Sequence, residues 1–377
     1  MSTDLPTGPV AGASDAGEAT TEHLTELSGN LGRPEPTRVS RRRRRGLPLL
    51  GLGLVLATLG GMVRLPYYAM SPGEARGVGA LVTVDDPNAH PVRGDVLFTT
   101  VRLSERVTAY EIFAGWLNRD IDIIPEQDVN RGAPSRVVRK VNLDLMADSK
   151  ITALKVAFER VGYRVGVQGN GAIVTAVNSA PALGQLEEGD LVLSVDGHQV
   201  RRNDEAVAEV RKHRVGDEIE IRFERDGREM TALLRAADRG DGEALVGVEL
   251  QTKDLRYDFP FEVTVDTGEV SGPSAGLAFT LALIDRLSAG DLTGGGRIAV
   301  TGTIDPEGKV GRVGGVRQKT AAAIAAGAIA FLVPPDEEAE ARARAGKKMQ
   351  VIAVATVDEA VDALQRLGGS RPEFAAR

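Results

Sequence analysis

The stretch Ser271-Gly272-Pro273-Ser274-Ala275-Gly276 opens directly into an apolar run that continues to Ile284. Proline favours the first turn of a helix and Gly272 leaves the approach open, so we predict a helix that begins beside Ser274 and ends near Leu287. The run is apolar on nearly every side, which predicts a buried helix. Its free N–H groups and positive end then point at whatever Ser274 contacts, an arrangement that can stabilise an oxyanion.

A lysine farther along the chain is predicted to return to this serine. Residues 297–304 are typical of a strand and 305–308 of a turn, after which the chain enters a second helix that carries Lys319. On that helix Lys319 shares the face of Val316 and Ala323. Burial on an apolar face lowers the pKa of a lysine and lets it act as a general base at neutral pH. Serine at a helix start is also a common N-cap, so Ser274 alone does not identify a nucleophile.

Three ordered motifs in this region resemble the proteolytic domain of Lon proteases. They are Gly272-Pro273-Ser274-Ala275-Gly276, Thr301-Gly302-Thr303-Ile304, and Gly314-Gly315-Val316-Arg317-Gln318-Lys319, the last followed by an alanine-rich helix and Ile329 to Pro334. The resemblance covers about Phe261 to Gln365. It implies that Ser274 is the nucleophile, that Lys319 is its base and that Thr301 helps to orient the lysine. Ser271 and Thr303 depart from the family pattern, which usually has acidic residues at these two positions.

Composition excludes several other chemistries. The chain has 377 residues, 42% of them apolar, and a net charge of −7 without a basic patch in the part expected to fold, so nucleic acid is not an expected partner. It has no cysteine, and none of its four histidines lies in the Lon-like region or in a His-Glu-x-x-His pair, so no metal is expected. No G-x-x-x-x-G-K-[ST] motif occurs, so no ATP or other cofactor is implied.

The N-terminal region predicts a membrane anchor. Residues 1–45 are rich in small, polar and acidic residues, which predicts disorder, and end in five arginines at 41–45. Residues 46–63 then form an uncharged, mostly apolar stretch about 27 Å long as a helix, followed by Tyr67 and Tyr68. The arginine run predicts a cytoplasmic N-terminus, a single transmembrane helix at 46–63 and extracytoplasmic domains after it. The alternatives are a cleaved signal peptide, a buried core helix and a nucleic-acid-binding arginine run.

Residues 71–147 predict an α+β region. Ala80 to Val84 and Gly94 to Val101 are typical of strands, and Val107 to Leu117 of a helix that contains Trp116. The second strand is similar to an early strand of Lon proteolytic domains, which implies that the protease domain begins here and that the next module is inserted into it. The alternative is a separate small region. Leu143 to Val161 predicts an amphipathic helix. Its expected core residues are Leu145, Ile151, Leu154 and Phe158.

Residues 162–235 resemble a bacterial PDZ domain. The expected features are a strand at Ala172 to Val177, a helix at about Asp204 to Lys212 and a hairpin that turns at 225–228. PDZ domains bind an extended peptide as an added strand. The segment Tyr163 to Val167 lies where the loop for the peptide's terminal carboxylate is expected.

Together these observations predict an α+β protein with a PDZ domain at 162–235, a Lon-type proteolytic domain at 243–368 and one preceding transmembrane helix. The chain resembles the membrane-anchored PDZ-Lon proteins of Gram-positive bacteria, which implies an ATP-independent serine endopeptidase acting on unfolded or membrane-associated proteins. Lon relatives also suggest a homo-oligomer, possibly a ring. Two alternatives stay open: a non-catalytic scaffold in which the PDZ domain binds peptides, and a hydrolase that pairs Ser274 with Asp266 or Glu269.

Overall fold

The computed structural model describes residues 58, 61–85, 90–268 and 270–372. The predicted disordered segment 1–45, its arginine run and most of the predicted span at 46–63 lie outside these residues. Within the described ranges, no helix combines the length and apolar character needed to cross a membrane.

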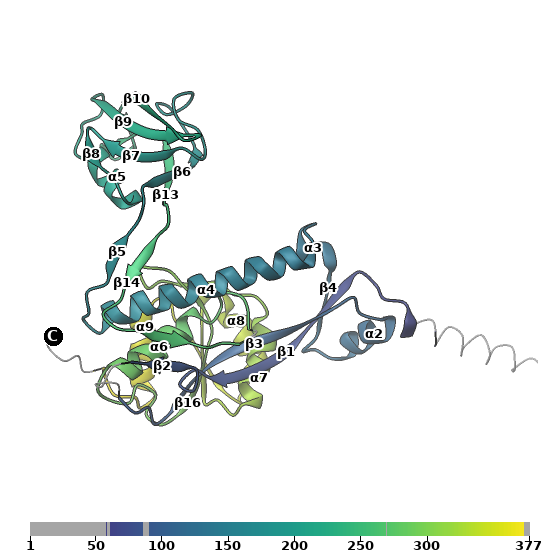
Figure 1. The fold of residues 1–377 in the computed structure, drawn as a ribbon. Coiled ribbons are helices and arrows are strands. Elements are labelled where there is room, and N and C mark those ends of the chain that lie inside the picture. The colour runs from purple at the N-terminus through teal and green to yellow at the C-terminus, as the bar shows by residue number, and fades with distance from the viewer. Residues whose placement is uncertain (1–57, 59–60, 86–89, 269, 373–377) are drawn as a thin grey trace, which may run out of the picture. The chain divides into compact units, whose positions relative to one another are not determined.

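A six-stranded mixed sheet forms the centre of the larger domain (Figure 1). Its order is β20 (Gln350–Ala353), β19 (Ala330–Val333), β16 (Arg297–Val300), β3 (Asp95–Glu105), β1 (Tyr67–Gly77) and β4 (Asp122–Pro125). The four strands from β20 to β3 are parallel to one another, and β1 and β4 extend the sheet in antiparallel fashion.

This sheet joins segments from both ends of the sequence. Residues 95–98 of β3 pair in register with residues 297–300 of β16, so the segment before the predicted PDZ domain shares one sheet with the Lon-like segment after it. The chain between them, from β5 (Gly166–Gln168) to β14 (Arg256–Asp258), leaves and returns as an antiparallel two-stranded ribbon. The PDZ-like segment is therefore inserted into the chain that builds the larger domain.

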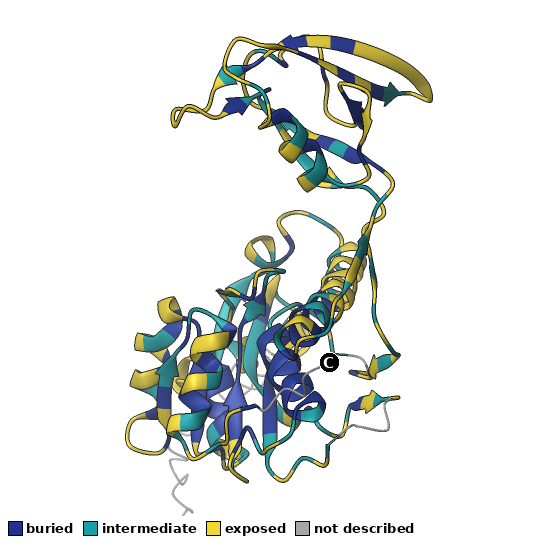
Figure 2. Cartoon of the chain, turned by 90° about the vertical axis from the view of Figure 1, so that its left-hand side faces the viewer, coloured by how far each residue is buried: buried dark blue, intermediate teal, exposed yellow. Residues whose placement is uncertain are grey.

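Helices cover both faces of the sheet because its central strands are buried on both sides. Val96, Phe98, Ile298 and Val300 pack towards one helical layer, whereas Leu97 and Ala299 pack towards the other. The first layer contains α4 (Ser135–Arg160), α6 (Gly276–Leu287) and α9 (Val357–Arg366), and the second α7 (Val316–Ala325) and α8 (Glu338–Ala345). Figure 2 shows these central strands in dark blue between the helices.

The inserted segment has its own sheet and core. The sheet order is β10 (Arg228–Arg235), β9 (Glu218–Arg225), β7 (Leu191–Val195), β6 (Ala172–Val177) and β13 (Val248–Thr252), with β8 (His198–Gln199) beside β7. Helix α5 (Asn203–Val210) packs against it. The predicted start of the protease domain at 243 is wrong, because residues 248–252 form the edge strand β13 of this second sheet.

The predicted carboxylate loop is also wrong. Tyr163 packs edge-on against Phe158 and Phe261, with ring centroids 5.4 Å away in each case. The following residues form β5, which pairs with β14 rather than bordering a groove. Because a three-residue strand and its partner lie about ninety positions apart, local pattern could not identify this pairing.

Helix α4 is longer than predicted and buries a different set of residues. Leu154 and Phe158 are buried as expected, but Leu145 and Ile151 are exposed. The face that packs on α6 instead contains Met146, Ser149, Ala153 and Ala157. Tyr68, expected at a membrane interface, is 4% exposed, and its hydroxyl contacts Asn130.

The remaining elements are short. They are α2 (Ala109–Leu117), α3 (Glu126–Asn130), the 3-10 turn η1 (Pro335–Glu337), and the paired strands β2 (Val82–Val84) with β15 (Val263–Val265), β11 (Ala237–Asp238) with β12 (Ala244–Leu245), and β17 (Thr303–Ile304) with β18 (Val310–Gly311).

Candidate active site

Ser274 lies in a loop held immediately before the buried helix α6. Helix α4 fixes this loop at two points: the Asn142 carbonyl accepts a hydrogen bond from the Gly272 N–H at 2.9 Å, and Ser149 Oγ donates to the Pro273 carbonyl at 3.1 Å. Ser274 itself is half-buried. The loop therefore presents a serine side chain at the positive end of a helix whose own residues are almost all buried.

Two backbone donors stand beside this serine. Among the described residues, the N–H groups of Ser274 and Ala275 donate no hydrogen bond, whereas the next N–H, that of Gly276, donates to the Pro273 carbonyl at 3.2 Å. Unused N–H groups at a helix start suit the negative oxygen that develops when a serine attacks a carbonyl. The loop thus combines a nucleophile with donors for an oxyanion.

Lys319 reaches this loop from the opposite helical layer. Helix α7 begins after Gly315, whose φ of 66° favours glycine, and a Cβ there would lie 2.7 Å from Val101 Cγ1. The Lys319 side chain is 2% exposed, and its Nζ donates to Thr301 Oγ1 at 3.1 Å. Burial lowers the pKa of Lys319 to about 7, and the charge of Glu337 partly opposes this effect. A large fraction of Lys319 is therefore neutral near pH 7.

Thr301 connects the lysine to the serine loop. Its hydroxyl accepts from Lys319 Nζ and donates to the Ser274 carbonyl at 3.2 Å, and the Gly302 N–H donates to the same carbonyl at 3.0 Å. Thr301 is fully buried, in the break between β16 and β17. The structure thus places the three predicted residues Ser274, Lys319 and Thr301 together.

Ser274 and Lys319 line one groove of about 750 Å³. Its walls come mainly from β1, β3 and the loop 270–275, and its lining includes Met70, Phe98, Thr99, Val101 and Leu103, with Asn142 and Met146 of α4. Within the described residues, no hydrogen bond joins Ser274 Oγ to Lys319 Nζ. Its partly apolar lining suits peptide side chains.

Glu337 is a neighbour of this site that sequence reasoning missed. It is 6% exposed, and its Oε1 accepts from the Val313 N–H at 3.3 Å and from Arg312 Nε at 3.4 Å. Its Oε2 is buried without a hydrogen-bond partner among the described residues. Ser271 and Thr303 are not acidic, and the negative charge that acts on Lys319 comes from Glu337 on η1.

The alternative carboxylate partners do not meet Ser274 in the described structure. Asp266 is exposed, and its Oδ1 accepts from the Gly268 N–H within a local turn. Asp266 does not line the groove. Glu269 lies outside the described residues.

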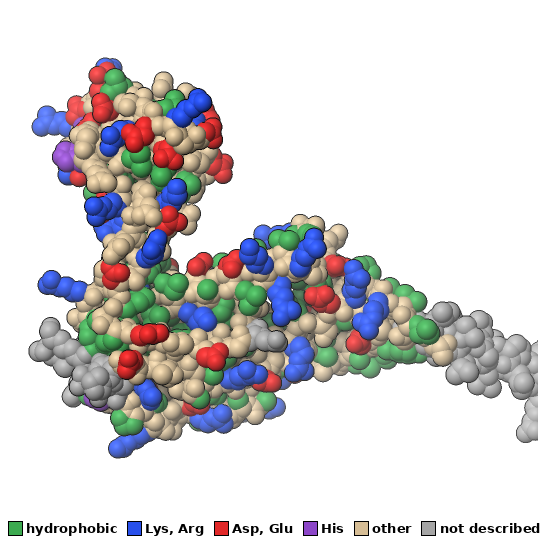
Figure 3. Space-filling model, viewed as in Figure 1, with side chains coloured by type: hydrophobic (Ala, Val, Ile, Leu, Met, Phe, Trp, Pro, Cys, Tyr) green, Lys and Arg blue, Asp and Glu red, His purple; other side chains and the backbone are tan. Residues whose placement is uncertain are grey.

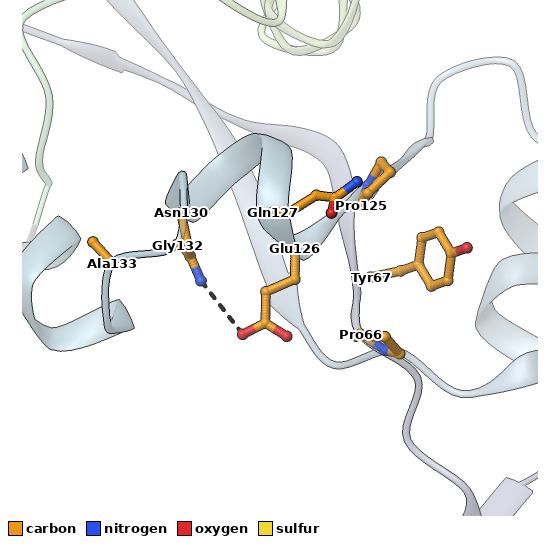
Figure 4. A pocket seen from close by; sticks show the side chains of 8 residues that line it. All are labelled: Pro66, Tyr67, Pro125, Glu126, Gln127, Asn130, Gly132 and Ala133. Carbon is orange, nitrogen blue, oxygen red and sulfur yellow. Dashed lines mark hydrogen bonds between the residues drawn. The ribbon is translucent and has the colours of Figure 1, made fainter.

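A second hollow of about 470 Å³ lies near α3 (Figure 4). Pro66, Tyr67 and Pro125 line one side of it, and Glu126 points towards Asn130, whose Nδ2 donates to Glu126 Oε1 at 3.4 Å. Its lining contains no serine or lysine. This hollow therefore lacks the groups that make the Ser274 groove a candidate for hydrolysis.

The PDZ-like sheet has a separate groove of about 570 Å³ between β13 and α5. Because β13 is an edge strand, its outer backbone groups can pair with an added strand. At its start, Gly247 has a φ of 84°, and a Cβ there would lie 2.4 Å from the Ser179 carbonyl oxygen. The N–H groups of Val246 and Gly247 donate no hydrogen bond within the described part of the chain, which suits a carboxylate.

Apolar side chains line much of this groove, including Val207, Val210, Val248 and Leu250. The groove therefore fits an extended peptide that ends in an apolar residue. The loop at the start of this groove's edge strand is therefore the segment before β13, not Tyr163 to Val167. The glycine between apolar residues in Leu245-Val246-Gly247-Val248 was the sequence signal that could have located this turn.

Comparison with known families agrees with both parts of the architecture. Residues 159–235 match the PDZ domain, and residues 253–366 match the Lon protease (S16) C-terminal proteolytic domain. The Lon protease of Desulfatibacillum aliphaticivorans is 32% identical over 114 residues, which are 29% of this chain and 14% of that protein. The Lon protease of Clostridioides difficile is 38% identical over 94 residues, which are 24% of this chain and 12% of that protein.

Among solved structures, the PDZ domain of the SdrC-like protein from Listeria monocytogenes matches 22% of this chain and 87% of its own, with 24% identity and a TM-score of 0.21. For the two Lon proteases above, the matched part of the chain covers only a small share of their length. Both family matches fall on the segments whose geometry is described above. The chain therefore combines a PDZ domain with a Lon-type C-terminal proteolytic domain, which supports a protease function.

Proposed function

We propose that the protein is a serine endopeptidase in which Ser274 and Lys319 form a catalytic dyad. The observation that carries this proposal is the buried Lys319 amine, which is joined through the Thr301 hydroxyl to the Ser274 carbonyl and lines the same groove as Ser274. Burying a lysine amine without a direct ion pair is costly, so its position needs a functional reason. A base with a pKa of about 7 beside a serine provides one.

The proposed reaction proceeds through an acyl-enzyme. Neutral Lys319 accepts the proton of Ser274 Oγ as that oxygen attacks the peptide carbonyl, which requires the two side chains to approach within hydrogen-bond reach when substrate binds. The N–H groups of Ser274 and Ala275 stabilise the oxyanion. The protonated Lys319 then donates its proton to the leaving amine, and water releases the acyl group by the reverse sequence.

The substrate class follows from what surrounds the dyad. The sequence has no nucleotide-binding P-loop, so we propose that hydrolysis needs no ATP and favours unfolded or flexible proteins. The edge strand β13 and its groove support substrate selection by the PDZ domain. We further propose that residues 46–63 anchor the chain, with the N-terminus in the cytoplasm and both domains outside, and that copies associate into a homo-oligomer, possibly a ring.

Cleavage of an unstructured polypeptide by the full chain in detergent, without nucleotide, tests this proposal. We expect wild type to cut and both Ser274→Ala and Lys319→Met to lose at least about a thousandfold in kcat. Arg317→Met is the matched control, because Arg317 lies on the same helix but forms an ion pair with Asp122 instead of lining the groove. Activity that survives in both dyad variants would refute the dyad.

The competing function is a scaffold that binds peptides without cutting them. The apolar PDZ groove is the observation that favours it. If wild type is inactive in the assay while a peptide with a free, apolar C-terminus binds the full chain, the scaffold function replaces the protease.

A further inference from the structure

The short helix α2 presents an unusual surface. Its large apolar side chains point outwards: Tyr110 is 51% exposed, Phe113 59%, Trp116 79% and Leu117 65%. The buried member of the helix is the smallest one, Gly115, where a Cβ would lie 2.9 Å from Ile123 Cδ1. A helix of a soluble protein normally shows the opposite distribution. The helix thus packs close to β4 through glycine and directs its aromatic residues away from the domain.

Charge is nearly absent from this face. Glu111 is the helix's one acidic residue, and it is occupied in a capping box in which it accepts from the Thr108 N–H at 2.7 Å and the Thr108 hydroxyl at 2.8 Å. The rings of Phe113 and Trp116 lie 6.2 Å apart and form a continuous apolar surface. Figure 3 shows hydrophobic side chains gathered over this part of the molecule.

The same surface continues into the start of the described chain. Met62 is 79% exposed, Val63 49% and Tyr67 37%. Backbone contacts join the two segments: Arg64 forms a bridge with Thr108, and the Leu65 N–H donates to the Val107 carbonyl at 2.9 Å. Helix α2 is therefore fixed within a few residues of the end of the apolar stretch 46–63.

We infer that the exposed face of α2 lies in the interfacial layer of a lipid bilayer, where Tyr110, Phe113, Trp116 and Leu117 enter the region between headgroups and acyl chains. Three features favour lipid over a second copy of the chain. The aromatic and leucine composition is typical of membrane interfaces. The face adjoins the end of the apolar stretch, which places it at the bilayer surface.

The third feature is the charge at the edges of α2. Arg64, Arg106 and Arg119 flank its two ends, are exposed and form no salt bridge within the described residues. Arginines beside an apolar face attract anionic headgroups, and the charge of Arg64 also acts on the Glu111 carboxylate. This inference rests on the proposed membrane anchor, and it adds a second contact that orients the domain relative to the bilayer.

Trp116 is the chain's single tryptophan, so its fluorescence reports on this face directly. The full chain is reconstituted into vesicles of phosphatidylcholine and phosphatidylglycerol, with the phosphatidylcholine either unmodified or brominated on its acyl chains. We expect brominated lipid to reduce Trp116 emission, more strongly when the bromine lies near the headgroup than near the chain end, because an interfacial helix is shallow. Acrylamide in the water should quench Trp116 weakly.

Two variants serve as controls. Phe113→Glu combined with Leu117→Glu retains the probe, and it should remove bromolipid quenching without releasing the chain from vesicles. Trp116→Phe combined with Leu233→Trp moves the probe to a residue of β10 that is 67% exposed, where bromolipid should not quench it.

Flotation of the same vesicles separates this inference from the anchor. A chain that floats but shows no bromolipid quenching of Trp116 overturns the inference and leaves the anchor standing. If Trp116 is then also protected from acrylamide, a second copy covers α2 instead. A chain that does not float refutes the anchor, and the inference fails with it.

Discussion

Burial removes water from the Lys319 amine, and this loss of hydration lowers its pKa to about 7. A general base acts in its neutral form, so we expect kcat/KM to rise about tenfold per pH unit up to about pH 7 and then to level. A pH profile of peptide cleavage by the full chain measures this. A profile that is flat between about pH 5 and about pH 8 would contradict the role of Lys319.

Glu337 modifies that profile. Its negative charge favours the protonated form of Lys319, so Glu337→Gln should lower the apparent pKa and extend activity to lower pH. Glutamine retains an oxygen for the Val313 N–H, which preserves the loop before α7. Asp336→Asn is the control, since Asp336 is an exposed neighbour on the same 3-10 turn. An unchanged profile in Glu337→Gln would show that its charge does not reach Lys319.

The same burial predicts a stability gain in an inactive variant. The pKa of Lys319 is lowered from 10.5 in the unfolded chain to about 7, so unfolding takes up a proton between these values. Stability should therefore rise as pH increases from about 7 towards 10.5, and the cost of the buried charge is fully present below about pH 7. Lys319→Met removes that cost, on the order of a few kcal/mol. Its Tm should exceed that of wild type at pH 6 and approach it at pH 10.

Substitution of Thr301 tests how Lys319 and the Ser274 loop are positioned, rather than the proton transfer itself. Thr301→Val removes both the acceptor for Lys319 Nζ and the donor to the Ser274 carbonyl. We expect kcat to fall about 10- to 100-fold, which corresponds to about 1–3 kcal/mol for an unsatisfied buried group. Thr301→Ser retains the hydroxyl and should retain most activity. Equal losses in both variants would show that packing, not the hydrogen bonds, is what Thr301 provides.

Sequence motifs could predict Ser274, Thr301 and Lys319 because each lies in a short segment of restricted composition, and the structure brings the three residues together. The motifs could not locate Glu337. The Pro-Pro-Asp-Glu sequence is typical of an exposed turn, and its burial depends on packing against the Val313 loop, more than twenty residues earlier. Asn142 and Ser149 were missed for a similar reason: they are seven residues apart on one face of α4, but their partners lie in a distant loop.

Besides Lys319 on α7, helix α6 contains a buried titratable group, Asp285. Burial raises the pKa of Asp285 from 3.8 to about 6, although its Oδ1 accepts from the Leu292 N–H at 2.7 Å. Its contribution to stability is fully present below about pH 4 and is lost as pH rises through about 6. Asp285→Asn should therefore raise the free energy of unfolding at pH 7.5 by an amount on the order of 2 kcal/mol, and raise Tm with it, and should have little effect at pH 4. Thermal unfolding at both pH values checks the sign.

Elements with strong local signals were predictable. The apolar run of α6 and the Asp-Gly turn between β9 and β10 are examples, and Asp226 and Gly227 have the positive φ values that such a turn requires. Elements defined by distant pairing were not predictable. The assignment of β13 to the PDZ sheet depends on its pairing with β6, some seventy positions earlier, and the same pairing decides where the peptide groove lies.

The groove between β13 and α5 predicts which peptides the PDZ domain prefers. A peptide with a free carboxylate and an apolar last residue should bind the full chain, and its C-terminal amide should bind at least about tenfold more weakly because the carboxylate loses its N–H partners. Val207→Arg should weaken binding, whereas Leu233→Arg, an exposed residue outside the groove, should not. Fluorescence polarisation measures both. Equal binding of the acid and the amide would contradict the assigned carboxylate loop.

The inserted arrangement of the whole molecule allows a clean deletion. Gln168 of β5 pairs with Arg256 of β14, so an Asn-Gly turn can replace residues 169–255 and close the ribbon as a hairpin. We expect this variant to cut short unstructured peptides at the wild-type rate. It should lose the preference for substrates with apolar C-termini. Unchanged preference would show that the PDZ domain does not select substrates.

The central claim concerns a serine activated by a buried lysine, and covalent trapping tests it most directly. The full chain in detergent, without nucleotide, is treated with a fluorophosphonate and analysed by intact mass and peptide mapping. We predict a single adduct on Ser274 that forms faster as pH rises through about 7 and is nearly absent in Lys319→Met. Labelling elsewhere, or labelling of Ser274 at the same rate in Lys319→Met, would contradict the account.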